Sequence, residues 1–493
     1  MEADDKRRLE LNENKTISSD RCNGTISVYL ILTFTVLLSL ILVIIEGARE
    51  NAIKMKVDLA ADLSLYSAFA EYNRELLKQF DLFFIDASYG LSHPDPANVG
   101  EHIKGYMNEN FKPVTEVGIV KDLTAIEAQQ VDILRYSLAT DEGGEVFKRQ
   151  AVLYMEDLLG MSYFDAIRRQ QSVVEDNELF TRDVQSERLR NQSELDSIEI
   201  PKKQKGKEWE DVELNNPADQ VNATRGNLAL VLNEGDELSV TSVNPANYVS
   251  GRTIEKGDGL AGRDGVNAGE ELIFNEYLMT KFGCFTSQKE ESELKYELEY
   301  LLEGKSSDIE NLKAVVNKLL LLRETANVTY LFSDAAKMAE AEALAIALTV
   351  EIPVPGIEIL VKLSLVFAWA YAEAVYDVRS LLHNKRVPLM KTAETWHYSL
   401  EGMMGMAGDS AEGEEGSGPE DGLSYKDYLR VFLMVEGNDK TLRAMDVIEM
   451  DIRRTTGNQS FRMDGCMDLI RMNAYTIRRY GKAHEVEREY FYM

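Results

Sequence analysis

The most apolar part of the chain lies close to its N-terminus. No charged residue occurs from Cys22 to Ile45, and residues 26–45 are almost entirely apolar. A helix needs about 20 mostly apolar residues to cross a bilayer, whereas the core of a signal peptide has only about 7–15. A cut after Ala48 would place Glu46 where signal peptidase needs a small residue. The pattern therefore predicts an uncleaved membrane helix rather than a signal peptide or a buried core helix.

The apolar pattern continues beyond this segment at helical spacing. From Ala48 to Phe80 the chain contains no proline and no glycine. Apolar residues recur there every three or four positions, as on one face of an amphipathic helix. They are Ile53, Val57, Ala60, Leu63, Tyr66, Ala70, Leu77 and Phe80. We therefore expect the membrane helix to continue as an amphipathic helix that packs on an external domain.

The remaining apolar patterns predict a mainly α (α+β) fold with a helical external domain and a small β-containing insertion. Helices are predicted over residues 100–180 in part (including 124–138 and 144–169), 290–303, 307–325, 332–349, 357–382, 424–435, 439–454 and 466–479. Ser307 and Glu310 have the spacing of a capping box. The very apolar segment 357–382 carries Lys362 and Glu373, so we expect a core helix rather than a second membrane span.

The predicted β structure lies at 82–90 and in the loop-rich insertion. Residues 82–90 have the pattern of a strand that ends in a turn. Residues 182–225, which precede the insertion, are strongly charged, and their basic run at 201–207 predicts a linker or exposed arm. The stretches 228–232 and 238–243 predict short β segments within a loop-rich insertion.

These patterns divide the chain into five parts. They are a cytoplasmic tail (1–21), a transmembrane helix (22–46), an N-terminal helical part (47–181), a charged linker with a small β/loop insertion (182–269) and a C-terminal helical part (270–493). Lys6, Arg7, Arg8, Lys15 and Arg21 precede the apolar segment, and only Arg49, Lys54 and Lys56 follow it closely. The positive-inside rule then predicts a single-pass plasma-membrane protein with a cytoplasmic N-terminus and an extracytoplasmic C-terminal domain.

Charge and cysteine content narrow the functional classes. The formal net charge of −30 repels nucleic-acid phosphates, so we expect no nucleic-acid partner. The chain has three cysteines, and Cys22 lies at the membrane edge. Cys284 and Cys466 would share the extracytoplasmic compartment and are candidates for a disulfide; the alternative is two unpaired buried thiols.

The search for chemistry predicts a non-enzymatic chain without cofactor or metal. Residues 257–262 match a dinucleotide-binding pattern, but that fingerprint must join a strand to a helix, and here we expect turn glycines. No two of the five histidines lie four residues apart, as a helical zinc pair would. The acidic stretch 402–423 lacks the ligand spacing of a calcium loop and is predicted to be a solvated loop.

Gly24, the apolar residues 25–45, the Glu46-Gly-Ala-Arg49 exit and the Leu-Ala-Ala-Asp sequence at 59–62 form a recognisable arrangement. It resembles the TadE/TadG-like proteins of bacterial tight-adherence (Flp-type) pilus systems. Further stretches are similar to an uncharacterised family of such proteins from Gram-positive anaerobes. They are residues 70–77, 84–90, 303–312 and 369–378.

One departure from that pattern affects the expected role. Prepilins that are cut at a glycine carry Glu at the fifth following position, where this chain has Tyr29. A Glu at that depth would need a partner in lipid, whereas Tyr29 suits the interface. Cleavage after Gly24 is therefore not expected, which favours an anchored accessory protein over a polymerised pilin.

The resemblance implies a structural or accessory component of a tight-adherence pilus-like assembly. Its partners would be the membrane and pilus or envelope proteins, with the oligomeric state open. We expect Gly24, Tyr29, Glu46 and Arg49 at the membrane boundary. Two alternatives are a membrane-anchored ligand-binding or sensory ectodomain and an envelope hydrolase.

Overall fold

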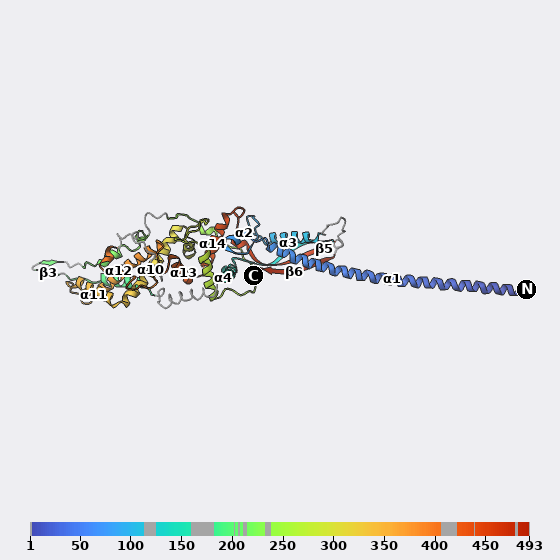
Figure 1. Ribbon diagram of the computed structural model, residues 1–493, viewed down its shortest axis with the longest axis horizontal. Helices are drawn as coiled ribbons and strands as arrows, with labels where there is room; N and C mark the ends of the chain where they lie inside the picture. The colour runs from blue at the N-terminus through green and yellow to red at the C-terminus, as the bar shows by residue number, and fades with distance from the viewer. Residues whose placement is uncertain are drawn as a thin grey trace. The chain divides into compact units, whose positions relative to one another are not determined.

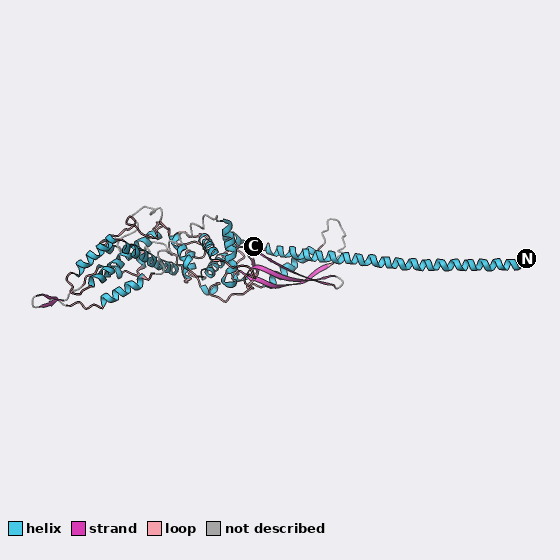
Figure 2. Cartoon of the chain, turned by 90° about the horizontal axis from the view of Figure 1, so that it is seen from below, coloured by secondary structure: helices cyan, strands magenta, loops and turns pink. Residues whose placement is uncertain are grey.

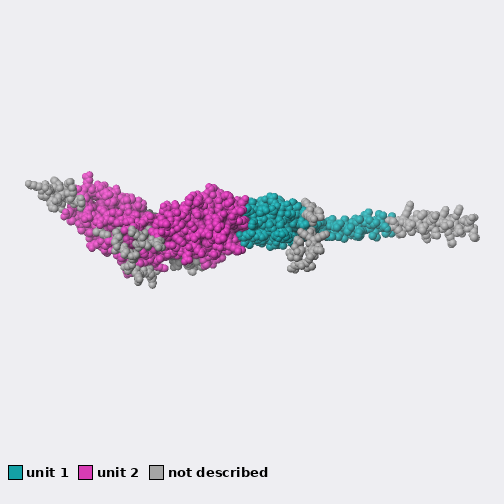
Figure 3. All heavy atoms as spheres, turned by 90° about the horizontal axis from the view of Figure 1, so that it is seen from above, with its two compact units in different colours: residues 1–71, 96–135, 470–490 teal, residues 72–95, 136–469, 491–493 magenta. Residues whose placement is uncertain are grey.

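The computed structural model describes residues 2–112, 125–158, 182–201, 203–205, 208–210, 214–231, 238–405, 422–437, 439–478 and 482–492. In these residues the chain is mainly helical with a small antiparallel sheet (Figures 1 and 2). It separates into two compact units (Figure 3). Unit 1 comprises residues 1–71, 96–135 and 470–490, and unit 2 comprises residues 72–95, 136–469 and 491–493.

The N-terminal helix α1 runs from Glu2 to Phe69 without a break (Figure 1). Its large apolar side chains from Ile26 to Ile45 are exposed. From Ile53 onward one face is buried, with residues three or four positions apart. The buried residues are Ile53, Val57, Ala60, Ala61, Ser64, Leu65, Ala68 and Phe69. The predicted continuation of the apolar helix into an amphipathic one is therefore confirmed.

The predicted continuation of this helix as far as Phe80 is wrong. The chain leaves the helix after Phe69, and α2 begins at Arg74 and ends at Phe80. The side chain of Asn73 accepts hydrogen bonds from the backbone N–H groups of Glu75 and Leu76, both at 3.1 Å. Asn is a favoured N-cap because this bond satisfies donors that have no partner within the helix. A new helix therefore starts here.

Unit 1 surrounds the second half of α1 with a helix and most of three strands. They are α3 (Pro96–Phe111), β2 (Ile126–Leu138), β5 (Cys466–Arg478) and β6 (Ala483–Phe491). Helix α3 packs against α1, and β5 pairs with β2 and β6. A Cβ at Gly100 of α3 would lie 2.8 Å from the Val131 carbonyl oxygen of β2. The absence of a side chain at Gly100 thus permits the close approach of helix and strand.

Two segments predicted as helices, 124–138 and 466–479, are the strands β2 and β5. In β2 the side chains of Ile126 and Ala128 are buried while Glu127 and Gln129 are exposed, which is the alternation of a strand. Strand β5 lies between β1 (Ile85–Asp86) and β2. Pairing with strands that are distant in sequence outweighed a helix-favouring local composition. The predicted strand at 82–90 is confirmed only in part, because just Ile85 and Asp86 form a strand before the turn.

Unit 2 is built mainly from helices. They are α2, α4 (Glu145–Leu158), α6 (Val184–Asp196), α7 (Pro217–Asn222), α8 (Ala268–Lys281), α9 (Glu297–Glu303), α10 (Asp308–Ser333), α11 (Ala335–Thr349), α12 (Ile357–Leu382), α13 (Tyr425–Val435) and α14 (Asp439–Arg453). Helix α12 is mostly buried and packs against α6, α7, α10 and α11. The predicted core helix 357–382 is thereby confirmed, residue for residue.

Most other helix predictions in unit 2 hold, with shifted ends. Ser307 caps α10 by accepting a hydrogen bond from the N–H of Glu310 at 3.4 Å. Helix α9 begins only at Glu297, so the predicted helix at 290–303 is too long at its start. Helix α4 ends at Leu158 among the described residues, and 159–169 lie outside them.

The β and linker predictions for residues 182–243 need correction. Residues 182–225 contain α6, α7 and a hairpin of β3 (Lys203–Lys205) with β4 (Glu208–Glu210), so they are not simply a linker. Residues 228–230 form a 3-10 turn instead of a strand. Residues 238–243 make only one bridge, Ser242 to Ser307, because no neighbouring strand extends the pairing among the described residues.

A network of buried charges joins α10, α12 and the loop after α12. The Arg323 guanidinium donates to Oδ2 of Asp377 at 2.9 and 3.0 Å. Lys391 lies 2.5 Å from Oε1 of Glu373 and 2.7 Å from Oδ1 of Asp377. All four side chains are buried. Two cations and two anions therefore balance inside the helical core, where an unpaired charge would be costly.

Candidate functional site: the charged junction of helix α1 and the C-terminal strands

Charged residues gather in unit 1 where the apolar part of α1 ends. Arg478, the last residue of β5, donates from both terminal nitrogens to Oε1 of Glu46, at 3.1 and 3.2 Å. Its Nη1 also lies 3.6 Å from Oε2 of Glu50. The Arg478 side chain is only 8% exposed. This arginine therefore links the C-terminal part of the chain to the helix at the first charges after the apolar segment.

Two further groups, at and just before the start of β6, contact Glu50. Lys482 Nζ lies 3.4 Å and His484 Nε2 lies 3.6 Å from Oε1 of Glu50. Burial would raise the pKa of Glu50, but the hydrogen bond from Lys482 and the charges of Lys482, His484 and Arg478 outweigh it and lower that pKa. Glu50 is consequently held as a carboxylate. We call Glu46, Arg49, Glu50, Arg478, Lys482 and His484 the junction.

Beyond the junction, β6 follows α1 through every second side chain. Arg488 donates to Asp58 at 2.8 Å and to Asp62 at 2.6 Å. Two residues further on, the ring of Tyr490 makes edge contacts with Tyr66 and Phe69, at centroid distances of 5.0 and 4.7 Å. Alternation in a strand places these side chains on one face. The last strand is thus fastened to the helix by charges and by aromatic packing.

The structure places two of the four predicted boundary residues in the junction. Glu46 and Arg49 lie on α1, with Arg49 Nη1 3.8 Å from Oε2 of Glu46. Tyr29 lies earlier in α1, within the exposed apolar stretch, and is 72% exposed. Gly24 lies in the same helix, before that stretch. The junction therefore brings together Glu46 and Arg49 but not Gly24 and Tyr29.

Sequence reasoning missed the junction residues of the C-terminal strands. The local pattern predicts a helix at 466–479 and indicates no element at 483–491. A signal for β6 is present, because Glu485, Glu487 and Glu489 alternate with His484, Val486, Arg488 and Tyr490. Nothing in this alternation indicates that the strand pairs with residues near position 50.

The junction holds α1 against the C-terminal strands through ion pairs. Its carboxylates contact cations of the same cluster. Partly buried ion pairs fix the geometry of two elements, because removal of one partner leaves the other charge desolvated. The arrangement therefore suits the transmission of position or force between helix and strands.

The two candidate disulfide cysteines are buried, free thiols in unit 2. The Cys284 thiol lies 3.6 Å from the Thr286 hydroxyl oxygen, and Cys466 donates to the Arg462 carbonyl oxygen at 3.5 Å. Burial raises the pKa of Cys284 to about 11 and that of Cys466 well above its usual value. Of the two alternatives drawn from the sequence, the structure contains the unpaired thiols.

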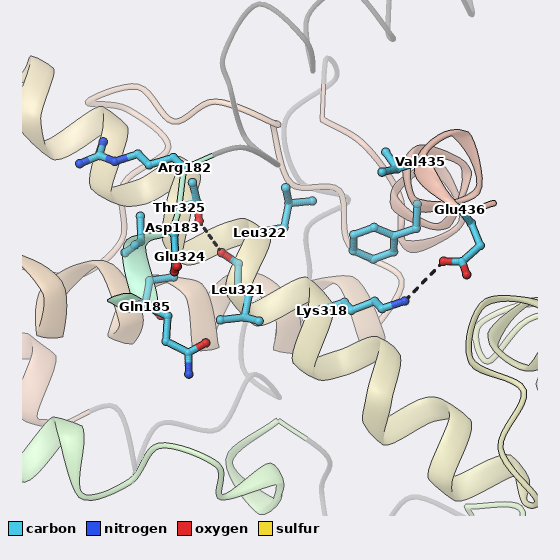
Figure 4. A pocket seen from close by; sticks show the side chains of 12 residues that line it. Arg182, Asp183, Gln185, Lys318, Leu321, Leu322, Glu324, Thr325, Val435 and Glu436 are labelled. Atoms are coloured by element: carbon cyan, nitrogen blue, oxygen red, sulfur yellow. Dashed lines mark hydrogen bonds and ion pairs between the residues drawn. The ribbon is translucent and has the colours of Figure 1, made fainter. Parts of the chain in front are cut away.

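Two adjoining cavities lie among the helices of unit 2. One, of about 320 Å³, lies among α6, α10 and α13, with Leu321, Leu322 and Val435 on its wall (Figure 4). In Figure 4, Lys318 and Glu436 face one another across one end of it; their charged atoms are 3.7 Å apart. The other cavity, of about 250 Å³, is lined by residues that include Arg188 and Arg225. Gln185, Leu321 and Glu324 line both cavities, so the two adjoin along α6 and α10.

The histidines, the acidic stretch and the glycines considered above for metal and dinucleotide binding lie partly within the described residues. In these parts no group of three or more His, Cys, Asp or Glu side chains is arranged to hold a metal ion. Residues 406–421 of the acidic stretch lie outside the described residues. Gly257 and Gly259 lie in a loop, where their N–H groups donate to Asp141, and Gly259 has a φ of 65°. They are turn glycines, as predicted.

The protein is mainly helical and begins with a long helix that carries an exposed apolar stretch. A family model described as a family of unknown function (DUF5702) matches residues 207–477, more than half of the chain. The protein therefore belongs to this family. Helix α1 and strand β6 lie outside the matched residues. No curated protein and no solved structure matches the chain.

Proposed function

We propose that this protein is a membrane-anchored, non-enzymatic structural component of a tight-adherence pilus-like assembly. The observation that carries the proposal is the continuity of α1, whose exposed apolar stretch continues directly into the stretch from Ile53 to Phe69 that packs within unit 1. The junction then ties this helix to β5 and β6. One continuous helix thus joins the apolar segment to the folded part of unit 1. Such a rigid connection suits an envelope protein that transmits force.

The anchor has the dimensions of a single membrane span. The exposed apolar residues from Ile26 to Ile45 would cover about 30 Å in a helix, close to the thickness of a bilayer core. The basic residues before the segment favour a cytoplasmic N-terminus, with the chain after residue 46 outside. Helix α12 also has the length and apolarity of a span, but its burial marks it as a core helix.

The assignment to a pilus-like assembly rests on the resemblance of residues 24–62 to TadE/TadG-like proteins. Tyr29, at the position where prepilins carry Glu, favours an accessory protein that keeps its anchor. The paired charges of the junction add support, since they serve to hold elements together.

A deletion strain tests this proposal. Electron microscopy of the native bacterium should show loss or shortening of surface fibres on deletion, with recovery when the wild-type gene is restored. A gene encoding Arg478→Gln should restore fewer fibres than one encoding Arg471→Gln, because Arg471 lies on the same strand but is 45% exposed. Normal fibres in the deletion strain would reject the pilus role. A soluble protein after cell fractionation would reject the anchor.

A second candidate function, a ligand-binding ectodomain, is favoured by the paired cavities of unit 2. Together they offer an apolar wall and cationic side chains, the usual combination in small-molecule sites.

A further inference from the structure

Arg188, on α6, is a partly buried cation that has no hydrogen-bond or ion-pair partner among the described residues. Its Nε atom is buried and makes no hydrogen bond. Among the described residues none forms a hydrogen bond or ion pair with this guanidinium. Burial and the neighbouring charge of Arg225 lower the pKa of Arg188, and the carboxylate of Glu324 offsets this only in part. Such a group costs free energy unless an anion satisfies it.

Among the described residues, the carboxylate that acts on Arg188 is that of Glu324, and Arg225 already binds it. Arg225 donates two hydrogen bonds to Glu324, both at 2.8 Å. The ring of Tyr371 lies against the same guanidinium, 4.1 Å from its central carbon. Arg225 is therefore fixed in place with its charge neutralised. The positive charge of Arg188 is left over at the wall of the 250 Å³ cavity.

This cationic cavity adjoins the apolar one. Gln185, Leu321 and Glu324 line both. Beyond them the larger cavity continues along Leu322, Phe432 and Val435, and Figure 4 shows Leu321 and Leu322 on the helix that forms this wall. A planar guanidinium binds a carboxylate through two parallel hydrogen bonds. An apolar wall of this size accommodates a short hydrocarbon chain.

We propose that the two cavities form a binding site for a small organic acid with an apolar tail. The carboxylate pairs with Arg188, and the tail lies along Leu321, Leu322 and Val435. The site goes beyond the proposed structural role; it rests on the second candidate function and names the class of ligand that unit 2 would bind. Because the chain as a whole is acidic, a free anion has little other reason to associate with it.

Calorimetric titration of the full chain in lipid nanodiscs tests the proposal, with empty nanodiscs as the blank. The probes are hexanoate, hexanol, acetate and inorganic phosphate. We expect saturable binding of hexanoate, with hexanol, acetate and phosphate each at least tenfold weaker. Equal binding of acetate or phosphate would show that the site recognises charge alone, and equal binding of hexanol that it recognises the tail alone. Either result overturns the proposal, as does a lack of hexanoate binding.

Matched variants separate recognition from folding. Arg188→Gln should weaken hexanoate binding at least tenfold, whereas Arg190→Gln, an exposed residue of the same helix, should leave it unchanged. Without ligand, Arg188→Gln should melt at or above the wild-type temperature, because it removes an unpaired charge. Leu321→Glu places a carboxylate in the cavity wall and should also abolish binding. Retained binding in Arg188→Gln would overturn the assignment of Arg188.

Discussion

Arg478 and Glu46 form an ion pair across 432 positions of sequence, with the guanidinium nitrogens 3.1 and 3.2 Å from one carboxylate oxygen. The pair joins the last residue of β5 to the first charged residue after the apolar segment of α1. Because the arginine is largely buried, its partners cannot be replaced fully by water. Helix α1 and the C-terminal strands should therefore unfold in one cooperative step.

Arg478→Gln should destabilise unit 1 by about 1–3 kcal/mol, since Glu46 and Glu50 both lose a charged partner. Urea unfolding of the full chain in nanodiscs, together with amide hydrogen exchange of β6, measures the effect. The control is Arg471→Gln on the same strand, whose exposed pair with Glu487 should contribute less than about 1 kcal/mol. Equal effects of the two variants would contradict a structural role for the junction.

Asp377→Asn should be among the most damaging single changes in unit 2. It removes the carboxylate shared by Arg323 and Lys391 and leaves buried positive charge without balance. Breaking such a pair costs about 3–5 kcal/mol. Thermal unfolding followed by circular dichroism measures it. Glu342→Gln is the control. The Glu342 side chain, which pairs with Lys362, is 58% exposed, so this pair should contribute less than about 1 kcal/mol.

Glu299 should make unit 2 less stable as the pH rises. Its Oε1 accepts hydrogen bonds from the Phe285 N–H at 2.8 Å and the Tyr425 hydroxyl at 2.7 Å, while its Oε2 is buried without a hydrogen bond. Burial raises the pKa of Glu299 to about 7. The folded form therefore binds a proton that the unfolded form releases above its ordinary pKa of 4.5. The stabilisation is complete below that value and is lost as the pH rises towards 7, by about 3 kcal/mol.

Glu299→Gln should remove this dependence on pH. The variant keeps an acceptor for Phe285 and Tyr425 but never ionises, so it should exceed the wild type in stability at pH 8 and resemble it at pH 5. Urea unfolding at both values tests this. Glu293→Gln, at a neighbouring residue that is 43% exposed, serves as the control. A variant that is less stable than the wild type at pH 8 would show that the carboxylate is needed.

Cys284 and Cys466 should resist thiol reagents until the protein unfolds. Both are buried, and burial raises the pKa of each, so little thiolate forms at neutral pH. Mass spectrometry of a Cys22→Ser variant after maleimide treatment should show no label on the folded protein and two labels in denaturant without reductant. No label in denaturant would instead indicate a disulfide between them.

The predictions that held rest on short-range patterns. The apolar stretch before Glu46 and the segment 357–382 can both be recognised as helices from their composition and apolar periodicity. These signals depend only on residues that are close in sequence. Ser307 signalled the start of α10 in the same way. The helix ends were less predictable. The break at Asn73 competes with a continuous apolar pattern, and only the capped geometry shows which of the two prevails.

The sequence by itself determined the apolar helix near the N-terminus, its amphipathic continuation and the central core helix, because each depends on neighbours within a few turns. Tertiary structure alone decided that 126–138 and 466–478 are strands, because their pairing partners are far away in the chain. It also decided the candidate sites. The junction needs Arg478 beside Glu46, and the cationic cavity needs Arg188 beside Arg225. No local pattern encodes such contacts, since they form only when distant elements pack and exclude water.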